Sequence, residues 1–139
     1  MLAVIRIRGR VGVRRGIRDT LKMLRLEKKN SCIVVPETPQ YLGMVRKVRD
    51  FVTWGPVSDQ TLQELVAKRA RNRENGKIGE EKVKSVVKNL KEGKKDEIKP
   101  YFSLSPPSKG FKGSVKQHYP RGALGNRGDK INELLKRMI

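Results

Sequence analysis

The chain has 139 residues, which is enough for one domain with added segments and too few for two full domains. Lys and Arg number 33 against 14 Asp and Glu, so the formal net charge is +19, and only 36% of the residues are apolar. A charge of this size repels itself in a compact fold, and a phosphate backbone is the common polyanion that relieves the repulsion. The composition therefore favours a nucleic-acid partner.

Cysteine content and apolar runs argue against export and against membrane insertion. The single cysteine, Cys32, cannot form a disulfide framework within the chain. The first apolar run covers only residues 2–5 before Arg6, which is too short for a signal peptide. No stretch approaches the roughly 18–20 apolar residues of a membrane span. We therefore expect a cytoplasmic protein with no membrane partner.

The charge is unevenly distributed along the chain. The net charge is +9 in residues 1–57, +3 in residues 58–97 and +7 in residues 98–139. The two ends are therefore predicted to contact the partner. The middle is predicted to be a solvated helical face, because mixed charges at helical spacing need no ligand.

Residues 1–57 predict a β-α-β-α-β core. Alternating apolar residues indicate a strand over 2–8, with Arg6 and Arg8 on the face opposite Ile5. Three glycines and three arginines in residues 9–16 predict a flexible basic loop. A helix over 17–27, a strand over 31–35, a helix from Thr38-Pro39 to about residue 50 and a strand over 51–54 follow. The pattern alone leaves strand order and direction open.

The second half predicts a helical insert, an arm and a last helix. The insert, 58–99, holds helices over 59–73 and 80–91, the first capped by Ser58. Residues 100–128 contain four prolines and five glycines, which predicts an extended basic arm with at most an edge strand at 101–105. The segment 129–139 predicts a helix whose apolar stripe docks on the core. Together these parts predict a single domain.

Several runs resemble the family of large-subunit ribosomal protein thirty, whose eukaryotic counterpart is large-subunit protein seven. They are IRIRG and DTLKMLRL near the start, PETPQYLGMVRKVRDFVTWG at 36–55, and the tail PRGALGNRGDKINELLKRMI. The resemblance covers residues 1–70 and 100–139, and it treats 71–99 as a variable insert. Because no long basic extension precedes the first strand, we expect the archaeal type.

The resemblance implies an α+β fold with a small antiparallel, ferredoxin-like sheet and two helices on one face. It also implies binding to large-subunit ribosomal RNA, with neighbouring ribosomal proteins as further partners. The family has no catalytic activity, so we expect no catalytic residue, cofactor, metal or small-molecule substrate.

Candidate RNA-binding residues fall into three groups. The planar guanidinium matches phosphate oxygens, and glycine lets the backbone approach them closely. The strand and loop offer Arg6, Arg8, Arg10, Arg14 and Arg15, the second helix offers Arg46, Lys47 and Arg49, and the arm offers Lys109, Lys112, Lys116, His118, Arg121 and Arg127. For the helix residues, RNA contact and simple solvation are equally open.

Other residues have both a functional and a plainer interpretation. Tyr101, Phe111 and Tyr119 could stack on unpaired bases or pack under the arm, whereas we expect Phe102 to pack. Trp54 is predicted in the core or an interface rather than as a platform for a base.

Two residues with reactive side chains, His118 and Cys32, could also have either a chemical or a purely structural role. His118 has no accompanying cysteine or carboxylate cluster, which argues against a metal site. Cys32 lies in an apolar run, which favours a small core residue over a nucleophile.

Two other classes of protein compete with a ribosomal RNA binder. A non-ribosomal RNA- or DNA-binding protein on a similar sheet is the second hypothesis, although an RNA-recognition motif would need aromatic residues that strand 2–8 lacks. A small α/β enzyme acting on a phosphate or acyl-phosphate substrate is the third. No acid, base or nucleophile can be assembled for it from the sequence.

Overall fold

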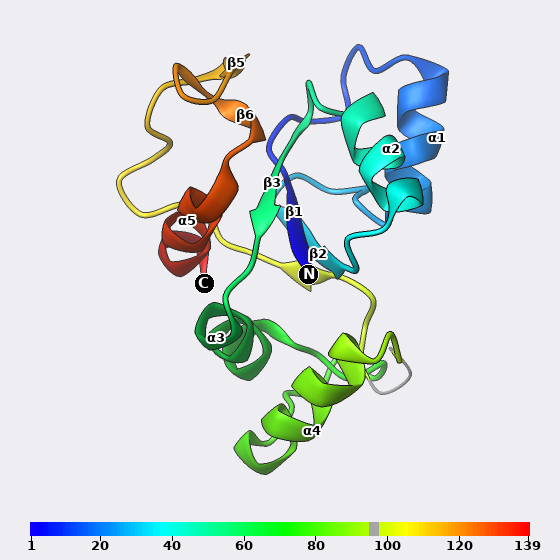
Figure 1. Ribbon diagram of the computed structural model, residues 1–139, viewed down its shortest axis with the longest axis vertical. Helices are drawn as coiled ribbons and strands as arrows, with labels where there is room; N and C mark the ends of the chain where they lie inside the picture. Colours follow the sequence, from blue (N-terminus) through cyan, green and yellow to red (C-terminus); the bar gives the residue numbers. More distant parts are fainter. Residues whose placement is uncertain (95–97) are drawn as a thin grey trace.

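The computed structural model describes residues 1–94 and 98–139 and has an α+β fold, as expected. Three five-residue strands form its centre: β1 (Leu2–Arg6), β2 (Ser31–Val35) and β3 (Val52–Pro56). β1 lies between the other two and is antiparallel to both, with Val4 opposite Ile33 on one side and Trp54 on the other (Figure 1). This antiparallel centre confirms the arrangement that the resemblance implies.

The segment predicted as an extended arm adds three more strands. β4 (Phe102–Ser103) pairs with β2, β6 (Gly122–Asn126) pairs with β3, and β5 (Ser114–His118) pairs irregularly with β6. The full order is β4-β2-β1-β3-β6-β5, and the sheet is mixed because β3 and β6 are parallel. The prediction of an arm with at most one edge strand is therefore wrong for residues 114–126.

Glycine explains why the sequence pattern missed β6. Glycine inside a strand weakens the strand signal and often marks a close backbone approach. A Cβ at Gly122 would overlap the carbonyl oxygen of Gln117, and a Cβ at Gly125 would lie 2.8 Å from the His118 ring. Only Ala123 and Leu124 remain as apolar residues in the strand, and both are buried.

Helices α1 (Arg15–Met23) and α2 (Pro39–Lys47) cover one face of the sheet (Figure 1). Their apolar residues pack against the β1 and β2 side chains of the same face, which include Leu2 and Val4. The Thr38 hydroxyl caps α2 by accepting from the Tyr41 amide at 3.4 Å, as predicted. α1 begins at residue 15 and ends before Arg25, whose φ of 57° is left-handed, so the predicted span of 17–27 was displaced.

Beyond the opposite face of the sheet, α5 (Ile131–Met138) packs against β3 and against α3 (Asp59–Arg69), and α4 (Glu80–Lys91) packs against α3 in the same apolar cluster. A 3₁₀ turn, η1 (Gly128–Lys130), leads into α5. Ala3 and Ile5 of β1 pack here, so β1 is buried on both faces, not on one as its sequence suggested. The Ser58 cap of α3 and the bounds of α4 are confirmed, while α3 ends four residues before the predicted position.

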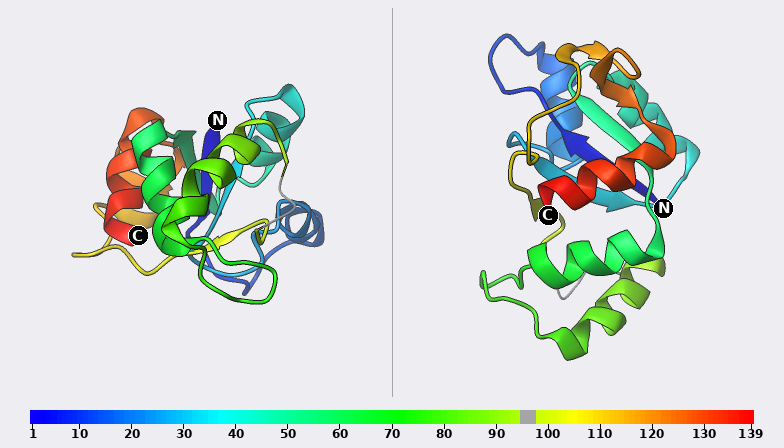
Figure 2. Two further views of the ribbon diagram at one scale, coloured as in Figure 1. Left: turned by 90° about the horizontal axis from the view of Figure 1, so that it is seen from below. Right: turned by 90° about the vertical axis from the view of Figure 1, so that its left-hand side faces the viewer.

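The arrangement gives the molecule two distinct ends. α3 and α4 pack together at one end, and β5 and the β1–α1 connection both lie at the other (Figures 1 and 2). None of the helices in the described part of the chain has the length and apolar character that crossing a membrane requires.

Gly55 on β3 provides a test of this packing. A Cβ at Gly55 would overlap the Gly128 carbonyl oxygen and lie 3.0 Å from Ile131. We expect Gly55→Ala to lower the free energy of unfolding by about 1–3 kcal/mol, measured by urea denaturation. Gly43→Ala, in open space on α2, is the matched control and should be neutral or stabilising by up to about 1 kcal/mol. Equal urea midpoints for the two variants would contradict the close packing of Gly55 against Gly128 and Ile131.

Candidate nucleic-acid interface

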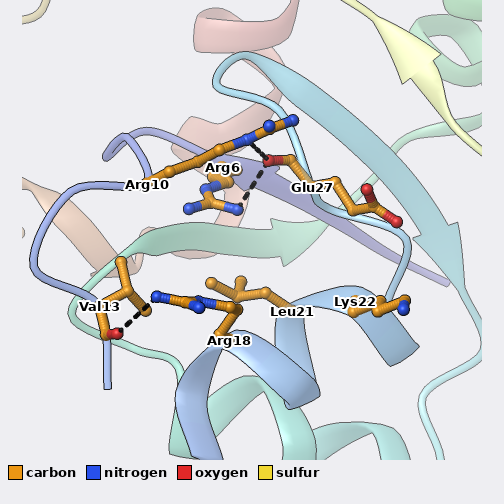
Figure 3. Close-up of a pocket in the computed structure, with 7 residues that line it drawn as sticks. All are labelled: Arg6, Arg10, Val13, Arg18, Leu21, Lys22 and Glu27. Carbon is orange, nitrogen blue, oxygen red and sulfur yellow. Dashed lines mark hydrogen bonds between the residues drawn. The ribbon is translucent and has the colours of Figure 1, made fainter. Parts of the chain in front are cut away.

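A buried arginine fixes the start of the basic loop, residues 7–14, which joins β1 to α1. Arg6 ends β1 and is only 3% exposed. Its guanidinium donates to four carbonyl oxygens, those of Leu26 at 2.6 Å, Arg8 at 2.8 Å, Gly9 at 2.9 Å and Glu27 at 3.0 Å. Figure 3 shows the bond to Glu27. Burial, and secondarily the charge of Arg10, lowers the pKa of the Arg6 guanidinium.

The burial of Arg6 differs from the exposed position that its prediction as an RNA-binding residue assumed. Alternation put Arg6 on an open face of the first strand, but the basic loop and the turn after α1 cover that face. The guanidinium is directed at backbone oxygens and is shielded from solvent. Arg6 therefore organises the loop that carries the exposed cations.

Arg10 adds a second tie between the loop and the same turn. Its Nε donates to the Glu27 carbonyl at 2.9 Å, while the residue as a whole is exposed (Figure 3). On the far side of the loop, Arg18 of α1 donates to the Val13 carbonyl at 3.5 Å. The loop predicted to be flexible is thus held by arginine–carbonyl contacts near both of its ends.

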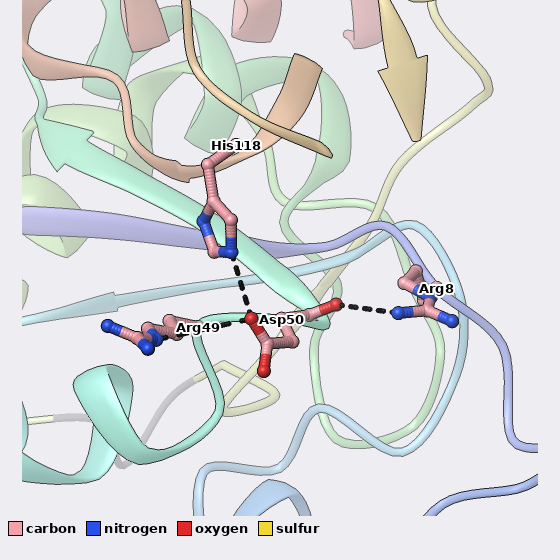
Figure 4. A network of polar contacts seen from close by, with 4 residues as sticks. All are labelled: Arg8, Arg49, Asp50 and His118. Atoms are coloured by element: carbon pink, nitrogen blue, oxygen red, sulfur yellow. Dashed lines mark hydrogen bonds and ion pairs between the residues drawn. The ribbon is translucent and has the colours of Figure 1, made fainter. Parts of the chain in front are cut away.

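Three cationic segments from distant parts of the sequence meet at one end of the sheet. His118 of β5 lies 2.9 Å from a carboxylate oxygen of Asp50, in the turn between α2 and β3 (Figure 4). Arg8 of the basic loop donates to the Asp50 carbonyl at 3.4 Å and covers the Phe51 ring at 5.1 Å. Arg49 approaches the same carboxylate at 4.0 Å. We call this region, formed by residues 7–15, 46–50 and 114–121, the basic end.

The N-terminus of α1 belongs to the basic end and is electrostatically unusual. The side chain of Arg14, the cap residue, makes no capping bond, and the first turn contains no acidic residue. Arg14 and Arg15 are exposed, and the Lys47 ammonium approaches Gly16 from α2. Cations beside a helix N-terminus oppose the helix dipole, whereas an anion there is stabilised by it. A bound phosphate group would neutralise this arrangement.

The remaining predicted cations occupy different environments. Arg46 and Lys47 are exposed on α2, and Lys116 and Arg121 are exposed on β5 and in the turn that follows. Two others, Lys109 and Lys112, are exposed on the segment leading to β5.

Neighbouring arginines fix two parts of this C-terminal region. Arg137 of α5 donates to the Ser108 carbonyl at 2.7 Å, which ties the segment carrying Lys109 to α5 rather than to the basic loop. Arg127 is half-buried, donates to the Ala123 carbonyl at 2.9 Å and covers the Tyr119 ring at 5.3 Å. Burial lowers the pKa of Arg127. The bond to the Ala123 carbonyl ties the Arg127 side chain to β6.

Trp54, Phe102 and Cys32, which the sequence analysis singled out, lie in the core. Trp54 and Phe102 are buried, as expected. Cys32 is fully buried in the core, and burial raises the pKa of its thiol to about 12. It is therefore a neutral core thiol at physiological pH, which confirms the plainer interpretation. Within residues 1–94 and 98–139, no group of three His, Cys, Asp or Glu side chains gathers as a metal site would require.

Arg18 and Lys22, two cations that lie beside the basic loop, were not singled out from the sequence. Both are exposed on α1 and line a cavity of about 330 Å³ beside the basic loop. Their separation of four residues places them on one face of the helix, facing the loop. Both residues lie within the predicted helix 17–27, but the sequence does not show that the basic loop packs beside this face of the helix.

The structural role of Arg6 is testable without any partner. Replacing Arg6 by Gln removes charge-assisted bonds to buried carbonyls, so we expect unfolding free energy to fall by about 2 kcal/mol or more. Denaturation of the purified chain in urea measures the change. Arg14→Gln, which removes an exposed arginine from the same loop, should stay within about 0.5 kcal/mol of the parent. An Arg6→Gln variant as stable as the parent would mean that the loop is held by other contacts.

Comparison with known proteins agrees with this architecture. Residues 2–52 match the family described as ribosomal protein L30p/L7e. Over 99% of both chains, the protein is 45% identical to large ribosomal subunit protein uL30 of Archaeoglobus fulgidus. It is 41% identical to the protein of that name from Methanosphaera stadtmanae over the full length of both. A third relative with this name, from Nanoarchaeum equitans, is 43% identical over 100% of this chain and 99% of its own. The chain therefore belongs to the ribosomal protein L30p/L7e family.

Proposed function

We propose that this protein is a structural constituent of the large ribosomal subunit and that it binds ribosomal RNA through the basic end. The relatives that match it over their whole length carry the name of a large-subunit protein. Membership of this family makes the chain a structural component and not an enzyme. The RNA contacts of individual residues are our inference from charge, exposure and geometry.

The observation that carries the proposal is the convergence of three cationic segments on one end of the sheet. The basic loop, the α2–β3 turn and β5 are far apart in the sequence, yet they share contacts around Asp50. Neutralising several phosphates from one side of a molecule requires such a gathering, because each phosphate contact adds to affinity. A solvated surface has no need to bring them together.

Preorganisation of the loop supports the same conclusion. A flexible loop loses conformational entropy when it binds, which reduces affinity. Here Arg6 and Arg10 already fix the loop against the turn at 26–27. The exposed guanidinium groups are therefore presented from a backbone that needs little further ordering.

The proposed contact residues follow from this geometry. We assign Arg6 and Arg127 as structural supports, because both donate to backbone oxygens and because Arg6 is buried and Arg127 half-buried. The exposed or half-exposed cations proposed to contact RNA are Arg8, Arg10, Arg14, Arg15, Arg46, Lys47, Arg49, Lys109, Lys112, Lys116, His118 and Arg121.

Co-sedimentation tests the assignment to the subunit. A tagged copy, expressed in the organism that encodes it, is followed through a high-salt sucrose gradient of the lysate. We expect a peak with the large subunit that persists in salt, because a constituent fixed by many contacts dissociates slowly. Protein that remains at the top of the gradient, or that modest salt removes, would contradict a role as an integral constituent.

Charge reversal at the start of α1 separates RNA binding from folding. In the double variant Arg14→Glu/Arg15→Glu, glutamates favour the helix dipole, so thermal stability should hold or rise slightly. Affinity for a large-subunit RNA fragment should fall, and the slope of log affinity against log salt should become shallower by roughly one unit or more. Filter binding over a range of salt concentrations measures both quantities.

The matched control places the same charge change at the other end of the molecule. Lys84 and Lys88 are exposed on α4, outside the basic end. The variant Lys84→Glu/Lys88→Glu changes the net charge by the same amount, so it shows the general effect of lower charge. A salt slope that is equal in the two variants would place the RNA contacts elsewhere.

A further inference from the structure

The cavity beside the basic loop is not explained by phosphate contacts alone. Its volume is about 330 Å³, and it lies between the basic loop, α1 and the turn after α1. In Figure 3, Arg6 and Arg10 lie on one side of the gap and Arg18 and Leu21 on the other, with Lys22 and Glu27 at one end. This size falls within the range of pockets that hold small organic groups.

The floor of the cavity is apolar and its rim is charged. Val13 and Leu21 contribute apolar surface and are both at most 7% exposed. Among the described residues, the terminal nitrogens of Arg10 and the Lys22 ammonium have neither a hydrogen bond nor an ion pair. An apolar floor under unsatisfied cations suits a planar ring that carries a phosphate.

Glu27 indicates what kind of group enters. Its carboxylate is exposed at the rim and has no ion-pair partner within residues 1–94 and 98–139. A carboxylate repels a phosphate, so a site for phosphate alone gains nothing from one. A nucleobase with N–H donors is attracted to it, and guanine presents two adjacent donors, N1–H and N2–H, to match two carboxylate oxygens.

We infer that this cavity receives one unpaired nucleotide of the bound RNA, with guanine preferred. The base lies against Val13 and Leu21, and the planar guanidinium groups of Arg10 and Arg18 offer surfaces on which it stacks. Lys22 faces the nucleotide's phosphate, and Glu27 accepts from the base edge. The inference rests on the proposed RNA-binding function and adds recognition of a single base to it.

The walls of the cavity are fixed before any nucleotide binds. Arg6 and Arg10 both donate to the Glu27 carbonyl, at 3.0 Å and 2.9 Å, which holds one wall. Arg18 donates to the Val13 carbonyl at 3.5 Å and links the other wall to the loop. The base would therefore enter a site that the fold has already formed, which lowers the entropy cost of binding.

Methyl and amide NMR of the full chain tests the inference with short RNA probes. The trinucleotides UGU and UUU are titrated separately, and inorganic phosphate is titrated alone. We expect the Val13 and Leu21 methyl signals to shift with UGU, at a dissociation constant roughly fivefold or more below that for UUU. Glu27→Gln should bring the two constants to within about twofold, because the amide cannot accept both donors.

The control is Glu37→Gln, which removes an exposed carboxylate between β2 and α2, outside the cavity. It should leave the preference for UGU unchanged. Equal binding of UGU and UUU, no shift at Val13 and Leu21, or the same shifts with phosphate alone would each overturn the inference.

Filter binding of the parent chain to large-subunit RNA is measured in parallel. If that binding persists while the cavity shows no base preference, the proposed function stands and only the nucleotide site fails. If the parent chain shows no salt-dependent RNA binding, the proposed function itself fails, and the nucleotide site fails with it.

Discussion

The interface depends on the buried Arg6 guanidinium. The basic loop follows a strand, carries several arginines and would be driven outward by its own charge. Four backbone carbonyls, from both ends of the loop–helix unit, accept from Arg6 and offset the cost of removing its charge from water. One of the arginines that the sequence offers as a candidate RNA contact thus stabilises the fold. The exposed arginines of the loop keep their positions because the buried Arg6 ties the loop backbone to the turn after α1.

The fold gathers the basic loop, the α2–β3 turn and β5 at one end of the molecule. α3 and α4, where four acidic side chains stand among six basic ones, lie away from the basic end and are joined by the Lys91–Asp59 ion pair of 2.9 Å. At the basic end the cations outnumber the acids, and Asp50 is shared by Arg49 and His118. A field of one sign on one side orients a charged molecule as it approaches a polyanion, which increases productive encounters. The orientation of the protein toward a polyanion therefore depends on how the fold arranges the charged segments as well as on the number of charges.

The sequence predicted the parts of the fold that have strong periodicity or explicit caps. Thr38 and Ser58 identified two helix starts because their hydroxyls accept backbone bonds, and α4 was placed at its observed bounds. β6 was missed because a glycine-rich strand has too few side chains to alternate. Arg6 was misplaced because a strand pattern gives the face of a residue but not what later folds over it. The cavity at Arg18 and Lys22 needed the relative position of a helix and a loop, which no local pattern contains.

The uncapped, arginine-rich start of α1 lowers the stability of the isolated chain, and binding of an anion explains why the protein has it. An uncapped helix beginning with two arginines forgoes about 1 kcal/mol that an ordinary cap residue would supply. Proteins commonly keep such unfavourable features where binding requires them. A ligand that binds only the folded state returns the stability by mass action, in proportion to the logarithm of its concentration over the dissociation constant. For a strongly basic chain, a phosphate backbone that reaches α1 and the basic loop together would neutralise the repulsion among their cations. It would also accept from the free backbone N–H groups at the start of α1, as a cap residue does.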